Sequence, residues 1–88
     1  MPLIKFHANL RKITGMNEIA IQGASIRAVL ERFVKDFPDL QQYLLEDGQL
    51  HPHVLLVLNG QPLDLENDLG TPVSGQDALA IFPPIAGG

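Results

Sequence analysis

The sequence predicts an α+β domain in which one principal helix packs across a mixed sheet of four or five strands. The chain has 88 residues, which is enough for one domain and one core but too few for two. Residues 26–37 repeat apolar side chains with helical spacing, whereas short runs with strand-like patterns precede and follow them. A hairpin, a helix and further strands in a chain of this length are typical of a two-layer α+β domain.

The first two strands are predicted to form a hairpin. Residues 3–8 alternate between apolar and polar side chains, with Ile4 and Phe6 on the apolar face. Turn-forming residues occupy positions 14–17, and residues 18–22 alternate again. The second segment is therefore the expected partner of the first strand.

Residues 26–37 are predicted to form the principal helix. Ser25 precedes them as an N-cap, and Pro38 ends the helix. The apolar side chains that share one stripe of this helix are Ile26, Val29, Leu30, Phe33, Val34 and Phe37. Residues 39–46 are expected to add one or two helical turns, which Asp47-Gly48 stops.

The second half of the chain is predicted to supply the remaining strands. Residues 54–58 are continuously apolar, which is typical of a strand buried on both faces and central in its sheet. Asn59-Gly60 is a tight-turn signal, residues 61–65 are a candidate return strand, and residues 66–70 form a turn. Residues 78–82 form the last strand, which we expect inside the sheet, beside the first strand and parallel to it.

Composition limits the classes of function. A hydrophobic content of 45% and a charged content of 18% are those of a globular domain. The absence of cysteine excludes disulfides, thiolate nucleophiles and Cys-based zinc sites, and it suits a reducing cytoplasm. There is no signal-peptide pattern and no apolar run of membrane-spanning length.

Charge is distributed unevenly along the chain. All six basic residues lie within positions 1–35, whereas positions 36–88 contain only acidic charges. This distribution argues against a nucleic-acid binder, which needs a basic surface. The acidic half is either ordinary solubilising surface or a face that steers the chain end toward basic partners.

The usual catalytic and metal-binding patterns are missing from the sequence. There is no glycine-rich phosphate loop and no supported Ser/His/Asp arrangement. His51 and His53 can chelate a metal, but two ligands without a third make a poor site, so we predict no metal and no bound cofactor. Asp64, Glu66 and Asp68 surround a turn and are expected to be solvated.

The C-terminal segment is the remaining candidate site. Pro83-Pro84 removes two backbone donors, so the sheet cannot continue past it. At about 3.3 Å per residue, residues 83–88 reach roughly 20 Å beyond the last strand. Gly87 and Gly88 lack side chains, so the terminal carboxylate of Gly88 can enter a narrow channel in a partner. We therefore predict a rigid domain over residues 1–82 and a flexible tail over residues 83–88.

Several motifs occur together in an order known from one family. Residues 81–88 read Ile-Phe-Pro-Pro-Ile-Ala-Gly-Gly, Asn59-Gly60 follows the apolar strand, and Gly75-Gln76-Asp77 forms the last turn. Residues 8–11 (Ala-Asn-Leu-Arg) and 51–53 (His-Pro-His) add similar loops. Over the whole chain these motifs resemble the MoaD/ThiS family of ubiquitin-like β-grasp sulfur carriers. The family's usual Gly-Asp in the last turn is Gln-Asp here.

The resemblance implies a chemistry for Gly88. An E1-like activating enzyme would adenylate its carboxylate with MgATP, and sulfur from a sulfurtransferase would displace AMP to leave a thiocarboxylate. Adenylation makes a poor acyl donor reactive, and the sulfur anion is the nucleophile. The partner-binding residues that the resemblance implies are Phe82, Pro83, Pro84, Ile85, Ala86 and Gly87. The chain itself would be a carrier or co-substrate and not an enzyme, and we expect that no segment after Gly88 has to be removed.

The resemblance leaves the pathway open. The Phe-Pro-Pro-x-x-Gly-Gly ending favours the small subunit of molybdopterin synthase, in molybdenum cofactor biosynthesis, with a large synthase subunit as the sulfur acceptor. A carrier for cysteine or other metabolite biosynthesis is the close alternative. Thiamin carriers rank third, because they usually lack an insertion as long as residues 38–53. Two other classes are a protein modifier joined through Gly88 to lysines and an interaction domain with an inert tail.

Overall fold

Five strands form the main sheet of the computed structural model, which describes residues 1–7 and 9–84. They are β1 (Leu3–Phe6), β2 (Glu18–Ala20), β5 (Leu55–Leu58), β6 (Gln61–Pro62) and β7 (Ala78–Phe82). Their order across the sheet is β2-β1-β7-β5-β6. β7 runs parallel to β1 and antiparallel to β5, so the last strand lies in the middle of the sheet, as predicted.

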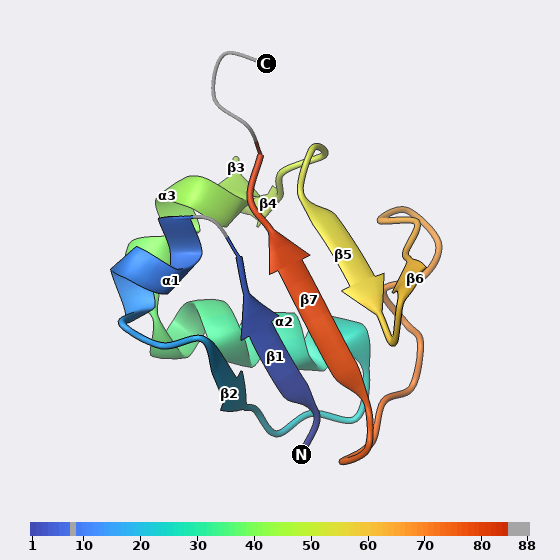
Figure 1. The fold of residues 1–88 in the computed structure, drawn as a ribbon. Coiled ribbons are helices and arrows are strands. Elements are labelled where there is room, and N and C mark those ends of the chain that lie inside the picture. Colours follow the sequence, from blue (N-terminus) through green and yellow to red (C-terminus); the bar gives the residue numbers. More distant parts are fainter. Residues whose placement is uncertain (8, 85–88) are drawn as a thin grey trace.

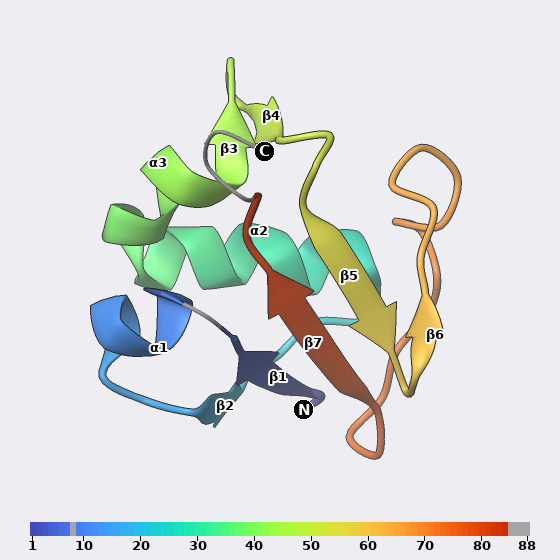
Figure 2. The same ribbon diagram turned by 45° about the horizontal axis from the view of Figure 1, so that its top comes forward.

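The helices and a small hairpin complete the domain. They are α1 (Asn9–Thr14), α2 (Ile26–Asp36), the 3₁₀ turn η1 (Pro38–Leu40), α3 (Gln41–Leu44), and the hairpin strands β3 (Leu45–Glu46) and β4 (Gln49–Leu50). In Figure 1, α2 crosses behind β1 and β7, and Figure 2 shows the same two layers from a tilted view. Within the described residues, no helix has the length and apolar composition that a membrane span requires.

The buried core lies between α2 and the inner face of the sheet. Its main members are Ile4, Phe6, Leu56, Leu79 and Ile81 from the strands and Ile26, Val29, Leu30 and Phe33 from α2. The rings of Phe6 and Phe33 stack with their centroids 5.3 Å apart, which ties β1 to the helix. The hydroxyl of Ser25 accepts a hydrogen bond of 3.2 Å from the N–H of Ala28, so the predicted N-cap of α2 is confirmed.

Two short elements were not predicted. α1 occupies the segment that was interpreted as part of the first hairpin, because Leu10 is fully buried and Ile13, three residues later, packs against the core. Gly15, at φ 73°, ends this helix and is not the centre of a tight turn between strands. Asp47 and Gly48, at φ 55° and 78°, form the turn of the β3–β4 hairpin, whereas the sequence interpretation used them only as a helix stop.

The predicted strand boundaries need correction as well. β1 ends at Phe6, and Ala8 lies outside the described residues. β2 ends at Ala20 and β6 contains only two residues, so both are shorter than predicted. The prediction that residues 54–58 are buried on both faces is wrong: the sheet has α2 on one face only, and Leu55 is 45% exposed on the other.

Candidate functional site

The candidate site begins where β7 ends. Both edges of β7 are paired, one with β1 and the other with β5, so Phe82 is held by the central strand of the sheet. Pro83 and Pro84 follow outside the strand and are partly buried. Neither carries a backbone N–H that can extend the ladder. The structure therefore gives the chain end a rigid mount.

The reactive end itself lies beyond the part of the chain that the structure describes. Ile85, Ala86 and Gly87 were predicted to bind a partner, and Gly88 was predicted to carry the covalent chemistry. All four positions lie outside the described residues. Their assignments stay predictions.

Among residues 1–7 and 9–84, no helix covers the side of the sheet opposite α2, and next to Phe82 this side carries apolar side chains. In the strand register Leu55 pairs with Phe82 and Val57 with Ala80, so these four side chains share one face. Lys5 pairs with Ala80 from the other side and adds a cation to the same face. We call these five residues, together with His7, the open face. Figure 1 looks onto this side of β1, β7 and β5.

His7 is a member of this surface that the sequence analysis did not identify. Its ring stacks on that of Phe82, with centroids 4.2 Å apart and an interplanar angle of 10°. The parallel pairing of Phe6 with Ile81 places the next residue of each segment side by side. The parallel arrangement was predicted but its register was not, and the register is the information that would have revealed this pair.

The motif residues far from the tail have a structural role. The side-chain amide of Asn59 donates to Asp77 Oδ1 at 2.8 Å, and its oxygen accepts the N–H of Ala78 at 2.9 Å. Asp77 Oδ2 also accepts the N–H of Ser74 at 2.8 Å. The hydrogen bond from Asn59 and, to a smaller extent, the one from Ser74 lower the pKa of Asp77. These contacts join the turn after β5 to the turn before β7 and so fix the start of the strand that carries the tail.

The two histidines of the loop before β5, His51 and His53, make contacts within their own segment of the chain. His51 Nε2 lies 3.2 Å from Glu46 Oε2, and His51 Nδ1 accepts the backbone N–H of His53 at 3.0 Å. No cluster of three or more potential metal-ligating side chains occurs within residues 1–7 and 9–84.

The acidic turn is exposed at Asp64 and Glu66, as expected, whereas Asp68 is partly buried. Asp64 accepts the N–H of Glu66 at 2.9 Å and the side-chain amide of Asn67 at 2.8 Å, and these bonds lower its pKa. Asp68 accepts the N–H of Asp64 at 2.8 Å. The carboxylates of Asp64 and Asp68 therefore organise this turn.

Comparison with known proteins identifies the group to which this architecture belongs. The model of the ThiS family matches residues 4–88. The chain belongs to the ThiS family. Small archaeal modifier protein 3 of Haloferax volcanii is 31% identical to this ThiS-family chain over 88 residues, which cover 97% of the chain and 96% of that relative.

Solved structures agree with this fold. The solution structure of small archaeal modifier protein 1 from Methanosarcina acetivorans matches with a TM-score of 0.87 and 26% identity, over 99% of this chain and 95% of that one. CysO, in its complex with BexX from Amycolatopsis orientalis, matches with a TM-score of 0.79 and 21% identity over 100% of both chains, which supports the fold alone. The chain thus has the ubiquitin-like β-grasp fold of the small sulfur carriers and modifiers, as predicted.

Proposed function

We propose that the protein is a sulfur carrier whose Gly88 carboxylate is converted to a thiocarboxylate. The observation that carries the proposal is the position of β7. It is paired on both edges and ends at Phe82 beside the open face, and in the sequence Pro83-Pro84 and a Gly-Gly end follow it. A partner can dock on the open face while the terminal residues reach its active site.

The chemistry proceeds in two steps on a partner enzyme. A carboxylate oxygen of Gly88 attacks the α-phosphorus of ATP, with Mg²⁺ as the nucleotide's counterion, and pyrophosphate leaves. A hydrosulfide anion then attacks the acyl carbon, AMP leaves with the bonding electron pair, and the S–H proton is lost to solvent, which gives the thiocarboxylate. We assign both steps to an E1-like activating enzyme and a sulfurtransferase, with this chain as co-substrate. The lack of cysteine fits a reducing compartment, and we propose the cytoplasm.

The open face is the proposed docking surface. Leu55 is the most exposed of its aliphatic side chains at 45%, and it lies opposite Phe82 at the base of the tail. Large exposed apolar side chains that gather on one surface mark interaction sites more often than scattered ones do. The solved complex of the fold neighbour CysO with BexX supports the expectation of a protein partner for this chain.

Within the carrier class, the Phe-Pro-Pro-x-x-Gly-Gly ending favours the small subunit of molybdopterin synthase, with its large subunit as the sulfur acceptor. A carrier for cysteine or other metabolite biosynthesis is an equally good fit to the fold. A protein modifier joined through Gly88 is the second candidate function, because the relative with 31% identity is named as a modifier.

The test is intact mass spectrometry of the chain isolated from its own cells. The proposal predicts that one terminal oxygen is replaced by sulfur, and that a variant with one alanine added after Gly88 lacks this change. A free carboxylate that persists with the cognate activating enzyme, MgATP and a sulfide source would refute the proposal. A ladder of higher-mass conjugates that disappears when Gly88 is deleted would instead support the modifier.

A further inference from the structure

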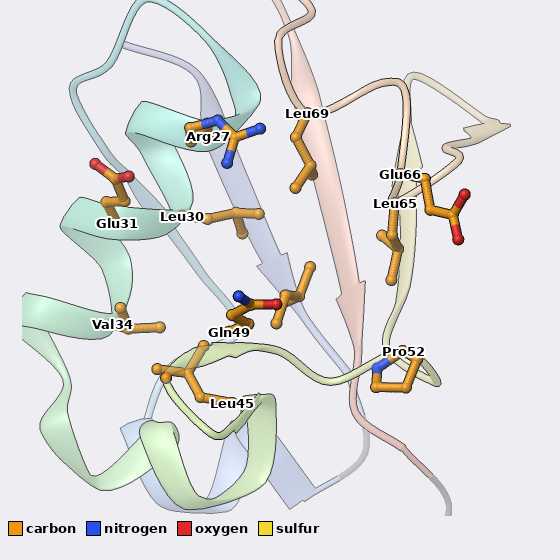
Figure 3. A pocket seen from close by; sticks show the side chains of 12 residues that line it. Arg27, Leu30, Glu31, Val34, Leu45, Gln49, Pro52, Leu65, Glu66 and Leu69 are labelled. Atoms are coloured by element: carbon orange, nitrogen blue, oxygen red, sulfur yellow. The ribbon is translucent and has the colours of Figure 1, made fainter.

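A groove lies on the helix side of the domain, away from the open face. It encloses about 640 Å³ between α2, the β3–β4 hairpin and residues 65–69. Its aliphatic lining comes from all three elements: Leu30 and Val34, Leu45 and Leu50, and Leu65 and Leu69. Figure 3 shows these walls around a common space. The volume is within the range of specific binding pockets, which is about 300–1,000 Å³.

The walls of this groove are preorganised. Leu30 is a member of the buried core, and Leu50, Leu65 and Leu69 pack against that core. The turn that carries Leu65 is held by the hydrogen bonds that Asp64 accepts. The hairpin wall has a tight turn with both central residues at positive φ. A ligand therefore meets a formed apolar surface and does not have to order it.

The charges around the groove are mostly negative. Glu31 and Glu66 lie on opposite sides of it with their carboxylates directed outward, whereas Arg27, the one lysine or arginine in the lining, points toward the space, as Figure 3 shows. Glu46 and Asp47 lie in the β3–β4 hairpin outside this lining, and Glu46 Oε2 lies 3.2 Å from His51 Nε2. The segments 45–52 and 64–69, which form two of the three walls, contain no lysine or arginine. Apolar walls inside an acidic rim are complementary to a ligand with apolar side chains beside positive charges.

We propose that this groove binds a basic amphipathic segment of a partner protein, with apolar side chains in the groove and lysine or arginine against its acidic rim. The site lies on the opposite face of the sheet from the open face. A partner can therefore occupy it while the C-terminal tail is inside another enzyme. This assignment does not depend on the chemistry of Gly88.

The test is an NMR titration of the isotope-labelled full chain with a synthetic amphipathic peptide. The peptide carries leucines at positions i, i+3 and i+4 with lysines beside them, and a matched peptide carries glutamates in place of the lysines. The proposal predicts shifts of the backbone amides of residues 27–34, 45–50 and 65–69 with the lysine peptide. It also predicts an affinity that falls as salt is raised, and at least tenfold weaker binding of the glutamate peptide.

Charge variants test the rim. The double variant Glu31→Lys, Glu66→Lys should lower the affinity for the lysine peptide about tenfold. Each solvent-exposed ion pair that changes from attraction to repulsion is expected to lower the affinity roughly threefold. Arg27→Ala should raise the affinity for the lysine peptide, because it removes the cation from the lining. The matched control is Glu18→Lys with Asp39→Lys, which makes the same change in net charge at exposed positions outside the groove. The control should leave the affinity within about twofold once salt screens long-range effects.

Several results would overturn the proposal. These are equal binding of the two peptides, shifts that map to residues 3–7, 55–57 and 80–82, or no shift with the lysine peptide. Concentration-dependent shifts of the groove amides without peptide would assign the groove to a second copy of the chain, and would also overturn it.

Discussion

Replacement of Leu55 by alanine tests whether the open face docks the activating enzyme. Full burial of a leucine side chain stabilises by about 1.5–3 kcal/mol. Leu55 is 45% exposed, so docking that covers it contributes about 0.7–1.4 kcal/mol. Since about 1.4 kcal/mol corresponds to a factor of ten, Leu55→Ala should raise the enzyme's KM for this chain about three- to tenfold.

The assay is ATP–pyrophosphate exchange by the activating enzyme at varied concentrations of the chain. Because Leu55 would contribute equally to the ground state and the transition state, kcat should stay unchanged. Tyr43→Ala is the matched control, since Tyr43 is 37% exposed but lies on α3, outside the open face. An unchanged KM for Leu55→Ala, an equal rise for Tyr43→Ala, or a loss in kcat alone would refute the docking argument. Thermal unfolding of both variants verifies that each is folded at the assay temperature.

Three further predictions concern contacts that stabilise the domain. His7→Ala removes the ring stacked on Phe82 and should lower the free energy of unfolding by about 0.5–1.5 kcal/mol in urea titrations, whereas His7→Phe should restore most of it. The pKa of Asp77 in the folded chain lies below the unfolded value of 3.8, so its hydrogen bonds stabilise the fold above that pH and are lost as pH falls through the folded pKa. Asp77→Asn should therefore flatten the fall in stability below pH 3.8, and an unaltered pH dependence would contradict the assigned contacts. Gly23→Ala places a Cβ 2.7 Å from the Val29 side chain and 2.8 Å from the Val29 backbone nitrogen in α2. It should lower the free energy of unfolding, measured by thermal unfolding, by roughly 1–3 kcal/mol. Gly70→Ala, whose Cβ has no atom within 4 Å, should change it by less than about 1 kcal/mol.

The elements that were predicted correctly are those whose signals are local and agree with one another. α2 combines an apolar stripe, the Ser25 cap and the Pro38 stop, and the structure has it over Ile26–Asp36. The prediction that residues 78–82 form a last strand beside the first one and parallel to it is confirmed, and Pro83-Pro84 marks where this strand ends.

The elements that were missed depend on distant contacts. α1 has only six residues and is stable because Leu10 is buried by the rest of the fold, which no local pattern reveals. The stacking of His7 on Phe82 depends on the register between segments more than seventy residues apart. The groove needs three separated segments to meet. The sequence analysis placed Leu30 and Val34 on the apolar stripe of the helix and Glu66 in a solvated turn, and it did not bring these segments together.

The one clear error about a strand carries information about function. The apolar run at residues 54–58 was interpreted as a strand buried on both faces, yet the sheet is covered on one face. Val54, Leu56 and Leu58 of this run contribute to the core, so core packing does not account for Leu55 and Val57, whose side chains point to the other side of the sheet. Both lie opposite residues of β7, and Leu55 lies opposite Phe82, where the tail begins. A strand with more apolar surface than its own fold covers is expected where a partner supplies the second layer, and here that layer would cover the base of the tail. The same reasoning applies on the helix side, where the leucines of the groove face an unfilled space with an acidic rim. The open face carries Lys5 opposite Glu18, whereas Arg27, Glu31 and Glu66 line the groove, so we expect the two surfaces, which lie on opposite sides of the sheet, to bind different partners.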